Sequence, residues 1–186
     1  MSATATIDTD LVTPLQAYLQ LRRHGRASFL LESVDQGRLG SHSFVGCGER
    51  LVTLAEAEML DVPVVGYLAY DHIAKLEPTV PLPADGPGVP ESQWVVADVF
   101  LRFDHVTGTA EVLHGDPAEV AALLAASVEP PAEGEGELGE TVRTPARDEH
   151  LRRVGVVKDH IRAGDAFQIV LSQRAERATP ASPLAV

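Results

Sequence analysis

The stretch ASFLLESVDQGRLGSHSFVGCG, residues 27–48, contains two apolar runs separated by the turn-forming residues DQGRLG. Two short apolar runs on either side of a polar, glycine-containing turn are typical of paired strands. We therefore predict a hairpin made of strands at 27–32 and 42–47. The first run ends in Glu32 and Ser33, which either close the strand or also bind a ligand.

The segment before this hairpin predicts a helix. In TPLQAYLQLRRHG, residues 13–25, Thr13 is placed at the N-cap, Pro14 at the first helical position and Gln16 at the third, which is a capping-box arrangement. Gly25 is expected to end the helix. Three residues are expected to form its apolar side: Leu15, Tyr18 and Leu19.

The segments after the hairpin predict more strands. ERLVTL at 49–54 and VPVVGYLAYD at 62–71 are strand candidates around a helical turn at 55–60, and the second strand is expected to be largely buried. Gly66 indicates a bulge or a close backbone approach. The proline-rich stretch 77–92 predicts an irregular loop. QWVVADVFLRFDH, at 93–105, then predicts one strand that pairs with 108–115 as a second hairpin.

A helix and an acidic linker follow. Asp116, Pro117 and Glu119 repeat the capping pattern and open a helix with Val120, Leu123 and Leu124 on one face. The glutamate-, proline- and glycine-rich residues that follow predict a solvated linker. We therefore expect a first domain at 1–128, a linker at 129–143 and the incomplete beginning of a second domain at 144–186.

The last segment predicts a helix and a strand. Thr144 and Pro145 are expected to start the helix and Gly164 to end it, and the residues Leu151, Val154, Val157 and Ile161 form a stripe typical of packing. AFQIVLSQR, at 166–174, predicts a strand with an apolar face and a polar face that carries Gln168. The predicted fold class is therefore α+β, with antiparallel sheets and flanking helices.

The final residues favour a continuation. Ser182 and Pro183 look like a helix start, but the chain stops at Val186, within one turn. We expect this chain to be the front piece of a longer protein, and a frayed natural terminus is the alternative.

Composition excludes several functions. Fifteen Lys and Arg residues against 27 Asp and Glu residues give a formal charge of −12, which disfavours nucleic acid and anionic membrane surfaces as partners. No apolar run approaches the roughly 18 residues of a membrane span. The single cysteine, Cys47, cannot form an internal disulfide, and the N-terminal residues lack a secretion signal, so we expect a cytoplasmic protein. Seven scattered histidines do not predict a metal site.

Three separated stretches resemble the N-terminal part of the anthranilate synthase component I family, within the chorismate-utilising enzymes. They are FLLESV with SHSFVG at 29–46, VGYLAYD at 65–71, and IRAGDAFQIVLSQR at 161–174, and FDH at 103–105 is a weaker match. The family converts chorismate and ammonia to anthranilate and pyruvate with Mg²⁺, in tryptophan biosynthesis. A glutamine amidotransferase subunit, component II, supplies the ammonia.

The resemblance also implies site residues. Members of the family are feedback-inhibited by tryptophan, and their L-L-E-S motif lines the effector pocket, so Leu31, Glu32 and Ser33 become candidate tryptophan contacts. The alternative is that Leu31 is core and the two polar residues begin a turn. Gln168 stands where related enzymes that add water carry a lysine base, and it is a near-substrate candidate or only a polar strand residue.

Strand geometry sets a condition on the effector site. Successive side chains of a strand point to opposite faces, so Leu31, Glu32 and Ser33 cannot all line one wall unless the strand ends there. If the site exists, the chain must leave regular strand geometry at Glu32.

Other residues in the matching stretches are expected to be architectural. Asp71 is expected to cap the next turn. His105 could act as a general base, but a turn histidine without an identified partner is more often structural.

Some features depart from the family. Ser41 and His42 stand where the family commonly has Arg and Tyr, and the segment between SHSFVG and GYLAYD is shorter than usual. The motifs that bind chorismate, hold Mg²⁺ and catalyse the reaction lie in the family's C-terminal half, so we expect this chain alone to be inactive. The alternatives are a fragment of aminodeoxychorismate synthase component I, which makes a folate precursor, and a free-standing amino acid sensor.

Overall fold

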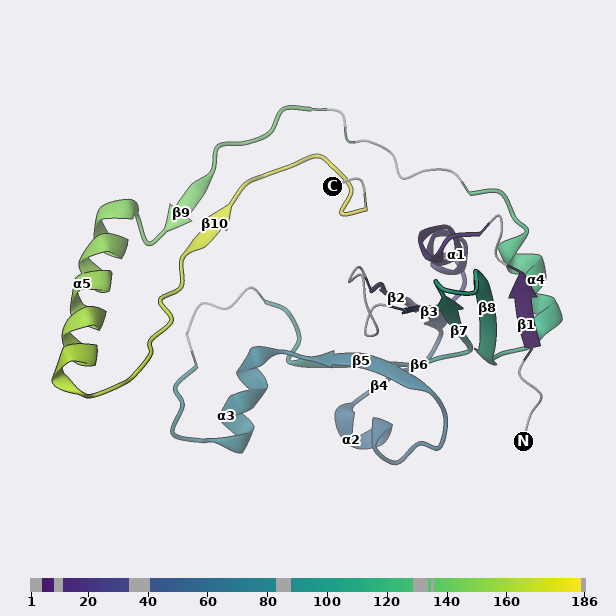
Figure 1. The fold of residues 1–186 in the computed structure, drawn as a ribbon, viewed down its shortest axis with the longest axis horizontal. Coiled ribbons are helices and arrows are strands. Elements are labelled where there is room, and N and C mark those ends of the chain that lie inside the picture. The colour runs from purple at the N-terminus through teal and green to yellow at the C-terminus, as the bar shows by residue number, and fades with distance from the viewer. Residues whose placement is uncertain are drawn as a thin grey trace. The chain divides into compact units, whose positions relative to one another are not determined.

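The computed structural model describes residues 5–8, 12–33, 41–82, 88–128, 134 and 136–184. It divides into two units, Met1–Val128 and Glu129–Val186, coloured in sequence order in Figure 1. Helices and purely antiparallel sheets occur together, which confirms the predicted α+β class. The predicted turn at 35–40, part of the proline-rich loop (83–87) and part of the linker (129–133 and 135) lie outside the described residues.

A five-stranded antiparallel sheet forms the centre of the first unit. Its order is β1-β8-β7-β3-β2, with the bounds Ala5–Asp8 for β1, Ala27–Leu31 for β2, His42–Gly48 for β3, Val99–Asp104 for β7 and Thr109–His114 for β8. The pairs β2–β3 and β7–β8 confirm both predicted hairpins. Strand β1 was not predicted, because this four-residue strand depends on pairing with the distant β8.

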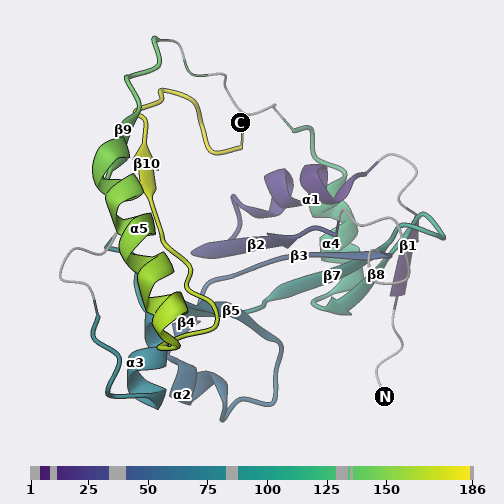
Figure 2. The same cartoon turned by 60° about the vertical axis from the view of Figure 1, so that its left-hand side comes forward.

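A second sheet has three strands in the order β4-β6-β5, with the bounds Leu51–Val52, Ser92–Val96 and Val64–Leu68 respectively. The prediction of one strand over 93–105 is wrong, because Ala97 and Asp98 divide it between the two sheets. The prediction of a largely buried strand at 62–71 is also wrong, since Gly66, Tyr67 and Leu68 are exposed. The short helix α2, Leu54–Ala57, contacts β6. Figure 2 shows α2 below β5, another strand of this sheet.

The corner between the two sheets has little spare room. A Cβ atom added to Gly48 would lie 1.9 Å from the carbonyl oxygen of Val96, so no side chain fits at this position. The backbone N–H of Glu49 donates to the Asp98 carboxylate at 2.8 Å. The end of β3 and the residues between β6 and β7 therefore lie close together where the chain passes between the two sheets.

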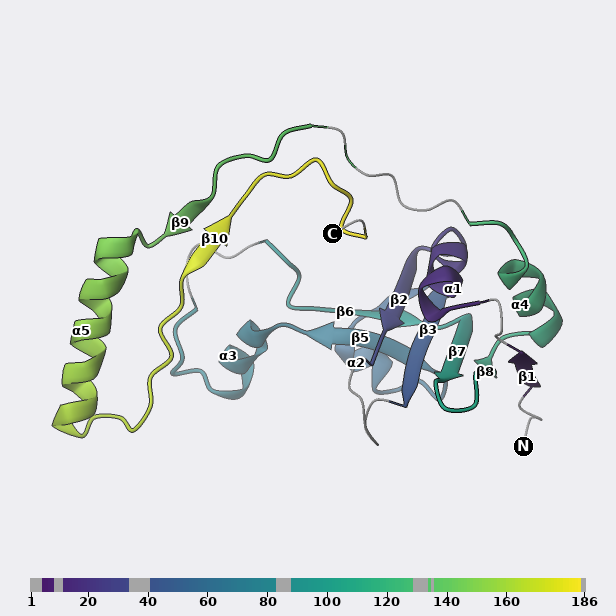
Figure 3. The ribbon, with the colours of Figure 1, turned by 45° about the horizontal axis from the view of Figure 1, so that its top comes forward.

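Helices α1, Pro14–Leu21, and α4, Pro117–Leu124, belong to the same unit, and α1 lies across β2 and β3 (Figure 3). The capping box of α1 is confirmed, since the Gln16 N–H donates to Thr13 Oγ1 at 3.2 Å and the Thr13 N–H donates to Gln16 Oε1 at 2.9 Å. Asp116 Oδ1 accepts the first N–H groups of α4 in the same way.

Two predictions for α1 need correction. The helix ends at Leu21 instead of continuing to Gly25. The predicted apolar side is right only in part, because Tyr18 packs against the core but Leu15 is 40% exposed, and the buried residues are Ala17, Gln20 and Leu21. The polar Gln20 is tolerated inside because its amide donates to the carbonyl oxygens of Leu124 and Ala126, at 2.7 and 2.6 Å.

The core of the first unit forms from α1, α4 and the inner strands of the five-stranded sheet. Valines, leucines, alanines and one phenylalanine fill it, and Cys47 is among them. Its buried members are Ala17, Leu21, Val45, Cys47, Leu101, Phe103, Ala110, Val112, Val120 and Leu124.

The chain after β5 forms a 3₁₀ turn, Tyr70–His72, and a short helix α3, Ile73–Leu76. The expectation that Asp71 caps this turn is wrong, since neither element begins with a side-chain cap. Glu91, at the end of the proline-rich loop, anchors the segment by accepting from Lys75 at 2.8 Å and by pairing with His72 at 2.6 Å. Both hydrogen bonds hold the pKa of Glu91 below its usual value.

The second unit contains β9, Val142–Thr144, helix α5, Arg147–Ala163, and β10, Arg174–Glu176, which pairs antiparallel with β9. The helix begins at Arg147 and not at Thr144, because Thr144 pairs with Arg174 in the sheet. Gly164 ends the helix in the left-handed conformation, as predicted (φ 85°). Glu149 pairs with Arg152 and Arg153, each at 2.7 Å, and these contacts lower its pKa to about 2.

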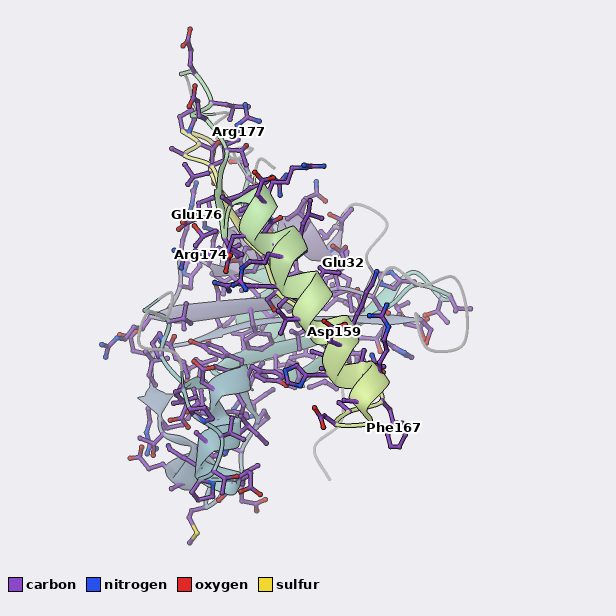
Figure 4. The ribbon with its side chains drawn as sticks, turned by 90° about the vertical axis from the view of Figure 1, so that its left-hand side faces the viewer. Glu32, Asp159, Phe167, Arg174, Glu176 and Arg177 are labelled. Carbon is purple, nitrogen blue, oxygen red and sulfur yellow. The ribbon has the colours of Figure 1, made fainter. Side chains whose placement is uncertain are left out.

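The predicted strand at 166–174 is wrong, since only Arg174 belongs to a strand. Phe167, expected in the core, is fully exposed and projects from the turn after α5 (Figure 4). The stripe on α5 is not packed either, because no residue of this helix is buried. Within the stripe, Val154 and Val157 are half-buried, whereas Leu151 and Ile161 are exposed.

The helices in the described part of the chain are all too short or too polar to cross a membrane.

Candidate functional site

The end of β2 is the centre of the candidate site. Leu31 is the last residue of the strand, so Glu32 and Ser33 lie outside it, as an effector site formed by all three residues requires. Leu31 is 52% exposed, and Glu32, labelled in Figure 4, is exposed as well.

The chemistry of position 32 explains why the strand stops. Leu31 pairs with Phe44, so the next pair of the ladder would be Glu32 with Ser43, on the same side of the sheet as Leu30 and the core. Ser43 is fully buried, and an ionised carboxylate placed there would lose its hydration. The chain therefore turns out of the sheet before Glu32.

Ser43 replaces the missing backbone pair. Its hydroxyl oxygen accepts the backbone N–H of Ser33 at 3.3 Å and lies 2.7 Å from Nε2 of His105, in the turn after β7. His105 therefore has a partner, which the sequence did not reveal because the two residues are far apart in the chain. The structural interpretation of His105 gains support from this contact.

Asp104 holds the turn that carries His105. Its Oδ1 accepts the backbone N–H groups of Val106 at 2.8 Å and Thr107 at 3.0 Å. These two hydrogen bonds, that from Thr107 being the stronger cause, keep the pKa of Asp104 below its usual value. His42, one of the departures from the family, lies nearby with Nε2 at 3.6 Å from Asp104 Oδ2.

A pocket of about 260 Å³ lies on the other face of β2, between the two sheets of the first unit. This volume is slightly below the roughly 300–1,000 Å³ of sites for drug-sized ligands, so it suits a smaller molecule. Apolar side chains form most of the wall, with Ser28, Tyr67 and Gln93 as polar members. The remaining lining residues are Ala27, Phe29, Leu31, Leu51, Val65, Gly66 and Val95.

This pocket brings two matching stretches together. Leu31 comes from the first stretch, and Val65, Gly66 and Tyr67 come from VGYLAYD. Gly66 confirms the predicted close approach, because a Cβ atom there would lie 2.3 Å from the Gln93 carbonyl oxygen and 2.6 Å from the Trp94 ring. A larger residue at position 66 would displace β6.

Glycine and aromatic packing shape the β2 side of the pocket. The rings of Phe29 and Phe100 meet edge to face, with centroids 5.5 Å apart. A Cβ atom on Gly46 would lie 2.4 Å from the Phe29 ring, so the glycine leaves room for it. The pocket therefore combines mostly apolar walls with polar groups of Ser28, Tyr67 and Gln93. Glu32 and Ser33 directly follow the lining residue Leu31 in the chain. Apolar walls with a few polar groups are a suitable set for an amino acid.

Gln168 belongs to the second unit. It lies in the irregular segment between α5 and β10, with an exposed side chain, and not on the predicted strand. Within the described ranges, no three His, Cys, Asp or Glu side chains gather where they could hold a metal ion. The described residues therefore do not form a Mg²⁺ site by themselves.

A family model described as chorismate binding enzyme matches residues 27–186. A protein named probable anthranilate synthase component 1, from Schizosaccharomyces pombe, is 31% identical over 221 aligned positions, which cover 95% of this chain and 45% of that protein.

Bacterial relatives give the same result. Anthranilate synthase component 1 of Thermus thermophilus is 31% identical, with 97% of this chain and 48% of that protein covered. The Streptomyces coelicolor protein of the same name is 33% identical, with 94% and 43% covered. The chain thus spans a little under half the length of the curated relatives that it matches, and the resemblance seen in the sequence is confirmed. Since the family model matches well over half of its residues, the chain belongs to the chorismate binding enzyme family.

Proposed function

We propose that this chain is the N-terminal portion of an anthranilate synthase component I. The observation that carries the proposal is the alignment of relatives with this name along nearly the whole chain, at 31–33% identity. The pocket supports it, because stretches that match the family in sequence meet there although more than thirty residues separate them.

The complete enzyme converts chorismate and ammonia to anthranilate and pyruvate, for tryptophan biosynthesis. A glutamine amidotransferase subunit supplies the ammonia, and Mg²⁺ takes part in the reaction. This chain by itself is inactive, and Gln168 approaches the substrate only in the complete enzyme.

The pocket between the sheets binds tryptophan as a feedback inhibitor. Leu31, Val65 and the other apolar lining residues provide walls for an indole ring. Glu32, which follows the lining residue Leu31, provides a carboxylate for the ammonium group, and Ser33, next in the chain, is the third candidate contact. The remaining wall comes from the rest of the enzyme.

Product analysis tests the proposed reaction. The complete reading frame that contains this chain is expressed, and the enzyme is incubated with chorismate, ammonium and Mg²⁺. Anthranilate, detected by its fluorescence, is the expected product. Aminodeoxychorismate as the product would instead assign the chain to the folate branch and overturn the proposal.

A further inference from the structure

We infer that His105 is a positioning residue for the effector site, acting through Ser43 on the backbone of Ser33. The inference rests on the proposed function, because it concerns the same tryptophan site. Its basis is the series of two contacts from His105 Nε2 to Ser43 Oγ, at 2.7 Å, and from Ser43 Oγ to the Ser33 N–H, at 3.3 Å.

The hydroxyl of Ser43 has a defined orientation in this series. Its oxygen accepts the N–H of Ser33, and the hydroxyl forms a second hydrogen bond with Nε2 of His105, in which the imidazole tautomer sets the donor. Ser43 is fully buried, so water does not compete for its hydroxyl. The imidazole thus fixes the direction of a hydroxyl that fixes the strand end.

The location of this contact gives it importance for binding. The hydroxyl meets the chain where the backbone ladder between β2 and β3 has just ended, so the path of Glu32 and Ser33 depends on a side chain. A less defined strand end would present the rim of the pocket in several conformations, and binding would have to select one of them.

The imidazole can be changed without dismantling the turn. The backbone N–H of His105 donates to the Ser41 carbonyl oxygen at 2.8 Å, and Asp104 accepts two backbone N–H groups of the same turn. Both contacts remain when the side chain of residue 105, which is exposed, is replaced. A loss of effector binding without a loss of stability is therefore expected from His105 substitutions.

The experiment uses the complete enzyme encoded by the reading frame that contains this chain, and it measures tryptophan inhibition together with the chorismate KM. We expect His105→Ala to raise the half-inhibitory tryptophan concentration about tenfold, the scale of one hydrogen bond, with unchanged KM and melting temperature. His105→Gln, whose amide oxygen reaches about as far as Nε2, should restore inhibition. His105→Asn, with a shorter side chain, is the matched control and should not restore it.

Ser43→Ala provides a second line of evidence. This substitution should also raise the half-inhibitory tryptophan concentration. The double variant with His105→Ala should have the same half-inhibitory concentration as Ser43→Ala alone, because both changes interrupt one series of contacts. Wild-type inhibition in all three His105 variants would overturn the inference and leave the effector site intact. A wild-type enzyme that tryptophan does not inhibit would overturn the proposed effector site itself, and this inference with it.

Discussion

Cys47 is a buried side chain, only 3% exposed, in the core of the first unit. Burial, helped by the negative charge of Asp98, raises the pKa of its thiol to about 11. At pH 8 roughly one thiol in a thousand is then ionised, and the thiolate is the form that reacts.

Thiol labelling measures this effect. With Ellman's reagent at pH 8, the native chain should react at least about a hundredfold more slowly than the chain unfolded in guanidinium chloride. Because the folded-state pKa is the higher one, the free energy of unfolding should also fall as the pH rises from about 9 toward 11. Equal labelling rates in the two states would contradict the buried position.

The two tyrosines of VGYLAYD allow a matched test of the pocket. Tyr67 lines it, whereas Tyr70 is 92% exposed on the following turn. In the complete enzyme, Tyr67→Ala should weaken tryptophan inhibition about tenfold or more through lost apolar contact, and Tyr70→Ala should leave inhibition unchanged. The measurement is the half-inhibitory tryptophan concentration of each variant. Equal effects of the two substitutions would exclude this pocket as the effector site.

At the scale of single elements, helix α1 shows how a face is selected. Leu21 is fully buried against the sheet, and Leu15, which the sequence pattern assigned to the apolar side, is 40% exposed. Leu21→Ala should lower the free energy of unfolding by about 2–5 kcal/mol, because it removes packed atoms and leaves a cavity. Leu15→Ala is the control and should cost less than about 1 kcal/mol.

Urea unfolding of the first unit, residues 1–128, measures the free energy of unfolding of the Leu21→Ala and Leu15→Ala variants. A larger loss for Leu15→Ala than for Leu21→Ala would mean that the helix presents its other face to the core.

Local signals were sufficient to predict some elements. Thr13 and Asp116 mark helix starts by hydrogen bonds to their own next turn, and Gly164 marks a helix end by its backbone conformation. These interactions involve residues within a few positions, so the sequence contains them entirely.

Elements that depend on distant partners could not be predicted. β1 exists because β8 pairs with it, and the strand over 93–105 breaks because its two halves join different sheets. The residues around Phe167 alternate as in a strand, but β9, the strand that pairs with this part of the chain, pairs only with residues 174–176. In the candidate site, the predicted strand included Glu32, and alternation required its exit only on the condition that all three motif residues share one site. The contact of Ser43 with His105 joins residues too far apart for any local pattern.

At the scale of the whole molecule, burial is unevenly distributed. Every apolar side chain found buried among the described residues lies in the first unit, up to Leu124. Hydrophobic burial is the main stabilising contribution to a fold. The two units should therefore differ in their ability to fold alone.

Truncated chains test this difference. The chain 1–128 should melt cooperatively, with a midpoint close to that of the chain 1–186, and the chain 129–186 should show no cooperative transition. Differential scanning calorimetry distinguishes the two cases. If 1–128 fails to melt cooperatively while 1–186 does, the second unit contributes to the stability of the first.

The early end of β2 also has an evolutionary consequence. Because the strand stops at Leu31, position 32 is free of the packing constraints that act on Leu30 and Val45. Mutations at this position can accumulate and be selected for their effect on ligand preference with little cost in folding free energy. Under the proposed effector role, residue 32 is therefore a position at which descendants of this protein can change their ligand preference while they keep the same fold.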